Sequence, residues 1–189
     1  ITIAVVAIIA SLALPSYRTI IEKRQVTSAA EQVGAFLSSV QMEAVKRGEN
    51  LWVSFTPPAG ADGNWCVGVT DHPSACTCNL DPTQFEPDDP GEYCEVVCYY
   101  RVIDNSSVKY PDIVKSMSDG NADNHVLIEP TRGLVHTDAS LGNYDTVDFA
   151  FLSDNESYGL NVQLSQAGKI RFCNSGYGSK SVPGYYSCQ

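Results

Sequence analysis

The chain has 189 residues and a mass of 20.5 kDa, enough for one domain of ordinary size. Hydrophobic residues make up 43% of it, which excludes disorder along the whole chain. The formal net charge of −10 argues against a protein that coats nucleic acid or anionic membrane with its whole surface. Three histidines, no phosphate-cradling glycine loop and no nucleophile motif predict a structural or binding protein, not an enzyme, and no cofactor.

Residues 1–14, ITIAVVAIIASLAL, form an uncharged run that is apolar on every face of a helix and is followed by Pro15. At 1.5 Å per residue such a run spans about 21 Å, less than a hydrocarbon core of about 30 Å. We therefore expect further residues upstream of Ile1. We also expect the run to insert into a membrane or to pack against copies of the chain.

An amphipathic helix is predicted next, because apolar residues recur every three or four positions over residues 17–45. The basic pair Lys46 and Arg47 suits a last helical turn, and Gly48 suits a left-handed cap. Residues 1–47 thus predict one helix of about 70 Å that is kinked or locally melted at the proline. No domain of this size is that wide, so the apolar first half must protrude.

Short apolar segments alternate with turn residues from residue 51 onward, the pattern of antiparallel strands. Ala167 and Gly168 predict a hairpin turn between the last two segments. The expected strands are LWVSF (51–55), WCVGVT (65–70), EVVCYYRVI (95–103), HVLIEP (125–130), VDFAFL (147–152), YGLNVQL (158–164) and KIRFC (169–173). The predicted fold class is α+β, with half of a long N-terminal helix packed on antiparallel sheet and with disulfides as a stabilising element.

Seven cysteines predict disulfides formed in an oxidising compartment, because their spacing does not fit a zinc site. The count is odd, so one thiol is left over or pairs outside the chain. We expect most strongly the pair Cys173 and Cys188, which would close the tail and contribute about 3 kcal/mol. The other pairings stay open, and the candidates are Cys66 with Cys98, and Cys76 or Cys78 with Cys94.

Asp119, Asn121 and Asp123 place oxygen ligands at alternate positions, as calcium loops do. The glycine and the glutamate that an EF-hand needs are missing, since Asn124 and Pro130 occupy those positions. We therefore favour a solvated acidic turn and expect no metal.

The tail from Gln166 to Gln189 contains three basic residues and no acidic one, so the remaining 165 residues carry −13. Aromatic side chains are interleaved with these charges, a combination that can bind a phosphate backbone and stack a base. The alternative is a tail that packs the last strand or contacts a neighbouring subunit. The candidate DNA-binding residues are Lys169, Arg171 and Lys180.

Both ends of the chain resemble a known superfamily. ITIAVVAIIASLALPSY resembles the N-terminal helix of type IV pilins and type II secretion pseudopilins. AAEQVGAFLSSVQMEAVKRGENLWVSF and GKIRFCNSGYGSKSVPGYYSC resemble the FimT/GspH-like minor pilins. The resemblance implies a leader peptide and a conserved glutamate upstream of this sequence. It also implies that Gly168–Arg171 stands for a Gly-Arg-x-Arg motif used in DNA uptake, with Lys169 in place of the first arginine.

On this resemblance we expect a non-enzymatic subunit of a type IV pilus-like filament, with other pilin subunits, the membrane and double-stranded DNA as partners. It would sit in the bacterial inner membrane by a single pass before assembly, and in a periplasmic or extracellular filament afterwards. The alternatives are a minor pseudopilin of type II secretion and a membrane-anchored periplasmic binding protein. The expected division is a membrane and filament-core helix over 1–25 and a globular domain over 26–189, with its helix half at 26–47 and a β-rich part at 51–189. The core-forming residues are Ile1, Ile3, Val5, Val6, Ile8, Ile9, Leu12, Leu14 and Pro15.

Overall fold

A single helix, α1, runs from Thr2 to Arg47 in the computed structural model. The structure describes the backbone of residues 2–56, 65–71, 76, 108–109, 112–115, 125–131, 135–136 and 146–188. Side chains are described for these ranges from residue 17 onward, apart from 112–115 and 135–136. The predicted core-forming side chains of residues 1–15 therefore lie outside the described ones. Among the side chains described, no helical stretch combines the length and apolarity of a membrane span.

The helix continues through Pro15 without interruption, so the local melting predicted as one alternative there is wrong. Its C-terminal end is built as the sequence predicts. Gly48 adopts a left-handed φ of 71° and donates its backbone N–H to the carbonyl of Ala44 at 2.9 Å. Arg47 pairs with Glu43 at 2.7 Å, and this hydrogen bond lowers the pKa of the Glu43 carboxyl.

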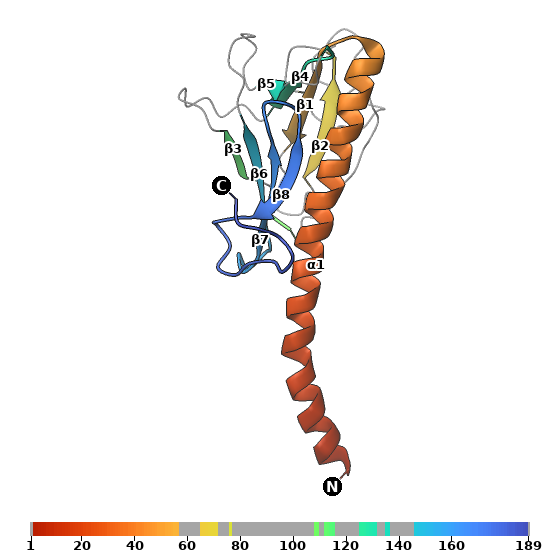
Figure 1. Cartoon of the computed structure of the whole chain (residues 1–189). Helices are drawn as coiled ribbons and strands as arrows, with labels where there is room; N and C mark the ends of the chain where they lie inside the picture. The colour runs from red at the N-terminus through yellow and green to blue at the C-terminus, as the bar shows by residue number, and fades with distance from the viewer. Residues whose placement is uncertain are drawn as a thin grey trace, which may run out of the picture.

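Among the side chains of α1 that are described, from Tyr17 onward, the apolar stripe is buried in the second half of the helix. Figure 1 shows the N-terminal half extending well beyond the strands, which gather along the other half. The first buried residue is Val26, and the others are Ala29, Ala30, Val33, Phe36, Leu37, Val40 and Ala44. Half of one continuous helix is thus packed on the domain, as expected, and the other half is not.

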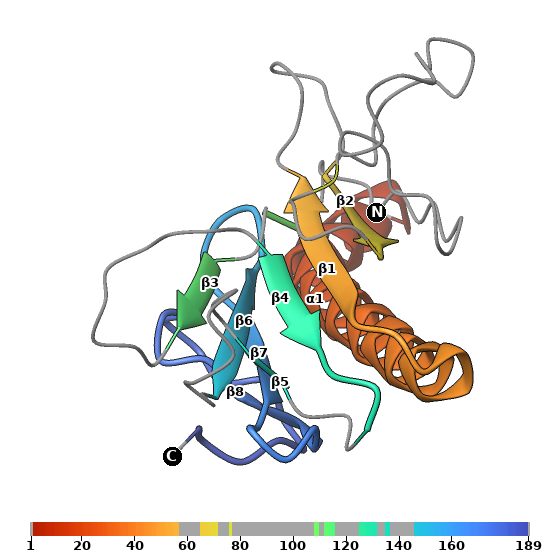
Figure 2. The same cartoon turned by 90° about the horizontal axis from the view of Figure 1, so that it is seen from above.

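The strands form two four-stranded antiparallel sheets, in the orders β2-β1-β4-β5 and β3-β6-β7-β8. They lie on one side of α1, as Figure 2 shows from above. The first sheet contains β1 (Leu51–Thr56), β2 (Cys66–Thr70), β4 (His125–Ile128) and β5 (Val135–His136). The second contains β3 (Asp112–Lys115), β6 (Val147–Leu152), β7 (Gly159–Leu164) and β8 (Ile170–Asn174).

Six of the seven predicted strands are present, and the predicted strand over 95–103 lies outside the described residues. The division into two sheets and the short strands β3 and β5 were not predicted. β5 has only two residues, too few for an alternating pattern to be recognised. The α+β class with antiparallel pairing is confirmed.

One core joins both sheets to the helix. The rings of Phe55 on β1 and Phe149 on β6 stack with centroids 4.8 Å apart. Trp65 and Phe151 lie 5.8 Å apart, and the Trp65 indole donates a hydrogen bond to the Val108 carbonyl at 3.2 Å. The helix closes this core by contacts with β4, β6, β7 and β8. The C-terminal strand β8, which forms part of the tail Gln166–Gln189, is therefore fixed against both the sheet and the helix.

Candidate functional site

The hairpin between β7 and β8 carries the first two candidate cations. Gly168 adopts a φ of 74° and donates its N–H to the Ser165 carbonyl at 2.8 Å. The Ser165 N–H donates to the Lys169 carbonyl at 3.0 Å, and the Lys169 N–H donates to the Ser165 hydroxyl oxygen at 3.1 Å. The Gln41 side chain donates to the Gly168 carbonyl at 2.7 Å and so ties this turn to α1. The predicted turn is present, and it holds Lys169 at a fixed point beside the helix.

Lys169 and Arg171 are both exposed at the start of β8. Ile170 and Phe172 alternate with them and pack against the core, so Arg171 stands on the opposite face of the strand. Neither cation forms an ion pair within the part of the chain that the structure describes. Two uncompensated charges two residues apart can reach one phosphate backbone, which is the chemistry expected of them.

Lys180 lies elsewhere, against the helix. Its backbone N–H donates to the Ser157 carbonyl at 2.8 Å, and its Nζ lies 5.8 Å from the centroid of the Tyr158 ring. Lys23 of α1 approaches the same ring, with its Nζ 5.0 Å from the centroid. Two lysines that are far apart in sequence therefore meet at one buried aromatic ring.

The structure does not bring Lys180 together with the other two candidates. Arg171 pairs with Gln163 on β7, whereas Tyr158, the residue beside Lys180, precedes the other end of that strand. The five steps from Tyr158 to Gln163 correspond to about 17 Å along the sheet. The three cations thus form two separate sites, the hairpin with Lys169 and Arg171 and the Tyr158 ring with Lys180. The sequence of the tail alone could not predict that Lys23 of α1 joins the Tyr158 site.

The tail is closed by the predicted disulfide between Cys173 and Cys188, whose Cα atoms lie 5.0 Å apart. The Asn174 side chain organises the loop from inside. Its Nδ2 donates to the carbonyls of Val182 at 3.1 Å and Tyr185 at 2.6 Å, and its Oδ1 accepts the Val182 N–H at 2.6 Å. Sequence reasoning missed this residue. The signal that could have found it is a polar residue at an inward position of β8.

The other cysteines are only partly described. Cys66 and Cys76 are buried and are each in a disulfide. Cys78, Cys94 and Cys98 lie outside the described residues, so the pairings suggested for them stay predictions. The acidic turn at Asp119, Asn121 and Asp123 also lies outside. No group of three or more His, Cys, Asp or Glu residues suited to a metal occurs in the described ranges.

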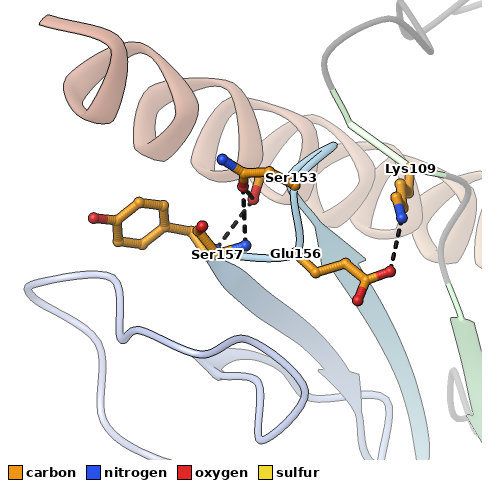
Figure 3. A network of polar contacts seen from close by, with 6 residues as sticks. Lys109, Ser153, Glu156 and Ser157 are labelled. Carbon is orange, nitrogen blue, oxygen red and sulfur yellow. Dashed lines mark hydrogen bonds and ion pairs between the residues drawn. The ribbon is translucent and has the colours of Figure 1, made fainter. Parts of the chain in front are cut away.

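The turn between β6 and β7 holds a polar network next to the Tyr158 site (Figure 3). Ser153 donates its hydroxyl to Asn155 Oδ1 at 2.9 Å, and the Ser157 N–H donates to the same oxygen at 3.0 Å. Asn155 in turn donates to the Glu22 carboxylate at 3.0 Å, which anchors the turn on α1. Ser153 Oγ also accepts the Tyr158 N–H at 3.1 Å, so the network fixes the backbone of Tyr158 relative to α1.

An exposed ion pair closes the other side of this turn, where Lys109 contacts Glu156 at 2.7 Å. The hydrogen bond raises the pKa of Lys109 and lowers that of Glu156. Glu156 has a φ of 55°, a left-handed conformation that costs a non-glycine residue some strain. The pair and the turn hydrogen bond from the Glu156 N–H to the Ser153 carbonyl at 2.8 Å hold it there.

The family model of GspH, the type II transport protein, matches residues 29–182, most of the chain. The chain belongs to the GspH family. It is a structural subunit of the minor pilin or pseudopilin kind, as its ends suggested. A solved structure that it resembles is the crystal structure of the type IV minor pilin FimU of Pseudomonas aeruginosa strain PAO1, at 17% identity, with 85% of this chain and 95% of that one covered and a TM-score of 0.46. No curated protein sequence matches the chain significantly.

Proposed function

We propose that this GspH-family chain is a subunit of a type IV pilus-like filament, held in the inner membrane by residues 1–25 until assembly moves it into a periplasmic or extracellular filament. The observation that carries this proposal is the half-packed helix. Of the described helix side chains, which start at Tyr17, the first buried one is Val26, while the continuous helix extends from Thr2 and its N-terminal half projects beyond the strands (Figure 1). The uncharged run 1–14 needs an apolar environment, which lipid supplies first and neighbouring helices supply later.

Replacing Ile8 by Asp tests the proposal, because a carboxylate at the bilayer centre costs on the order of 3 kcal/mol. We expect loss of membrane retention and of incorporation into sheared filaments, measured by fractionation and mass spectrometry. The matched control is Met42→Asp on the same helix, at an exposed position beside the domain, which should be tolerated. Normal filament incorporation of Ile8→Asp would refute the anchor and core role.

The second candidate function is a minor pseudopilin of type II secretion, and the printed name of the matching family supports it. Deleting the gene separates the two. Loss of surface pili with normal exoprotein release supports the pilus, and the reverse supports secretion. A membrane-anchored periplasmic binding protein would leave both intact.

We further propose that the hairpin cations bind double-stranded DNA for uptake. Lys169 and Arg171 support this because both are exposed on a rigid hairpin and neither is neutralised by a described acidic group. Two phosphate contacts per subunit predict weak binding with a salt slope of about −2. Lysine lacks the bidentate fork of arginine, so Lys169 would hold phosphate less tightly. Repetition along a filament would raise the avidity.

Fluorescence anisotropy with duplex DNA at low salt tests the DNA proposal. Lys169→Gln/Arg171→Gln should abolish binding, whereas Lys180→Gln should leave it unchanged, since Lys180 lies at the other end of the sheet. Equal loss in both variants would indicate a nonspecific charge effect. Unchanged binding by the double variant would remove the hairpin from the proposal.

A further inference from the structure

The surface where α1 leaves the domain differs in character from the rest of the chain. Five of the seven large hydrophobic side chains that are exposed in the described residues lie on this part of α1 or on the C-terminal loop 175–188. They are Tyr17, Ile20, Ile21, Tyr177 and Tyr186, and Tyr186 is 89% exposed. Three of them are tyrosines, which place an apolar ring beside a polar tip and are enriched where hydrocarbon meets water. We call this surface, formed by residues 17–24 and the C-terminal loop, the junction face.

Contacts between the loop and the helix hold the junction face together. Lys23 and Lys180 share the Tyr158 ring, and Tyr185 donates its hydroxyl to the Glu31 carboxylate at 3.1 Å. Figure 1 shows the loop beside the middle of α1, at the end of the domain from which the N-terminal half emerges. A bilayer that contains the run 1–14 would therefore meet the loop as well as the helix.

A groove of about 520 Å³ opens between the two parts of this face. Ile20, Val182 and Pro183 supply apolar walls, while Lys23 and Arg24 line it with positive charge. Thr27, Ser28, Glu31 and Tyr185 complete the lining. With two cations and one carboxylate, Glu31, the lining keeps a net positive charge beside its apolar walls, which suits a phosphate headgroup with the start of its acyl chains.

The charges of the face are unevenly compensated. Glu22 and Glu31 accept hydrogen bonds from neutral groups, the Asn155 amide and the Tyr185 hydroxyl, and so keep their negative charge, whereas Glu156 is paired with Lys109. The cations Arg18, Lys23, Arg24 and Lys180 form no ion pair within the described ranges. The junction face itself has four basic groups and one acidic group, Glu22. The neighbouring Lys109, Glu31, Asp154 and Glu156 bring the local balance to five basic and four acidic groups, in a chain whose total is −10. The face is therefore the part of an acidic domain that can approach an anionic surface.

The positions of the tyrosine and the cations along α1 also fit a bilayer surface as the partner. The polar layer of a bilayer is about 5–7 Å thick on each side, close to four residues of helix. Tyr17 and Arg18 follow the apolar run within that reach. Lys23 and Arg24 lie about 14–15 Å along the helix from Leu14, so their long side chains must extend back toward the headgroup phosphates. Close helix packing in a filament favours continuous apolar surface, and cations interleaved with tyrosines favour the lipid interface.

We propose that the junction face binds the headgroups of anionic phospholipids while the subunit waits in the membrane, so that the globular domain is docked on the bilayer by Tyr17, Arg18, Lys23, Arg24, Tyr177 and Lys180. This inference rests on the membrane anchorage proposed above. It adds a second, electrostatic contact, which assembly must release.

The test is hydrogen exchange of the full chain, followed by mass spectrometry, in nanodiscs of phosphatidylcholine alone or mixed with phosphatidylglycerol. Peptides from the C-terminal loop should exchange several-fold more slowly with the anionic lipid, since each lysine near such a surface contributes about fivefold in binding. This protection should vanish in Lys23→Gln/Lys180→Gln and, for the wild type, in 0.5 M NaCl, where the Debye length is about 4 Å. The matched control is Lys46→Gln/Lys169→Gln, which removes one lysine from the C-terminal end of α1 and one from the neighbouring hairpin. This variant should retain the protection of the loop.

The two proposals fail in different ways. A chain that inserts into both nanodiscs but shows equal exchange in the loop overturns lipid docking and leaves the anchor intact. Protection that appears only in assembled filaments also overturns it and assigns the face to a neighbouring subunit. A chain that does not stay in either nanodisc overturns the anchor itself. Exchange within β6 and β7 should be the same in all variants, which shows that they remain folded.

Discussion

The helix α1 approaches the sheet closely at Gly34, and adding a single methyl group there should be destabilising. A Cβ at this position would lie 2.5 Å from Cζ and 2.9 Å from Cε1 of Phe172 on β8. Carbon atoms prefer about 3.5–4.0 Å, so the ring or the helix must shift by about 1 Å. Such overpacking typically costs 1–3 kcal/mol. Replacing glycine by alanine within a helix gains about 1 kcal/mol, so we expect Gly34→Ala to lose about 1 kcal/mol overall.

The sign of this effect should reverse when the ring is removed. In a Phe172→Ala background the methyl group meets no ring, so only the helix-propensity gain of about 1 kcal/mol remains. The two substitutions should therefore couple by about 2 kcal/mol in a double-mutant cycle.

The assay is denaturant unfolding of the oxidised chain in detergent, followed by the fluorescence of the buried Trp52 and Trp65. In a parallel thermal unfolding experiment, Gly34→Ala should lower the melting temperature by about 3 °C for a chain of this length. Gly176→Ala, where nothing lies within 4 Å of the new Cβ, is the control and should change little. An additive cycle, or a more stable Gly34→Ala single variant, would refute this account of how α1 meets β8.

Two further predictions concern the second sheet. Cys173→Ser/Cys188→Ser should lose about 3 kcal/mol in the same unfolding assay, because the bridge closes a separation of 15 residues; an unchanged midpoint would show that it does not constrain the chain. Burial raises the pKa of Asp148, with partial offset by Gln163, so the stability linked to this carboxyl is present at low pH and is lost as pH rises through its folded pKa. Asp148→Asn should therefore be more stable than wild type at pH 7, and this gain should shrink as the pH falls toward 3.8, the ordinary pKa of Asp. A gain that does not depend on pH would contradict this explanation. So would an equal gain from Asp154→Asn, at an exposed position.

What the sequence predicted correctly depends on neighbours along the chain. The cap at Gly48 is a local feature, since it needs only a residue that accepts a positive φ after a basic last turn. The hairpin at Gly168 follows from the same rule. Six strands were recognised because burial on one or both faces makes each a short, largely apolar segment between turn residues.

What could not be predicted depends on contacts between distant segments. β3 is a strand through its pairing with β6, where Asp112 faces Ala150, and four residues give too little pattern of their own. The inward Asn174 has a clear role only when the loop that it holds is known. The meeting of Lys23 and Lys180 at one ring joins residues at opposite ends of the chain, and no spacing rule anticipates it.

That last contact changes how the basic tail should be interpreted. Read as a sequence, Lys169, Arg171 and Lys180 form one cluster suited to a single polyanion. In the fold, the hairpin pair lies at the start of β8 near Gln41, whereas Lys180 lies at the opposite end of the sheet, beside the part of α1 that leaves the domain. A filament subunit with its helix in lipid would then direct Lys180 toward the bilayer and the hairpin pair away from it. The two sites should therefore be separable: variants of the hairpin should affect only binding outside the membrane, and Lys180→Gln should affect only docking before assembly.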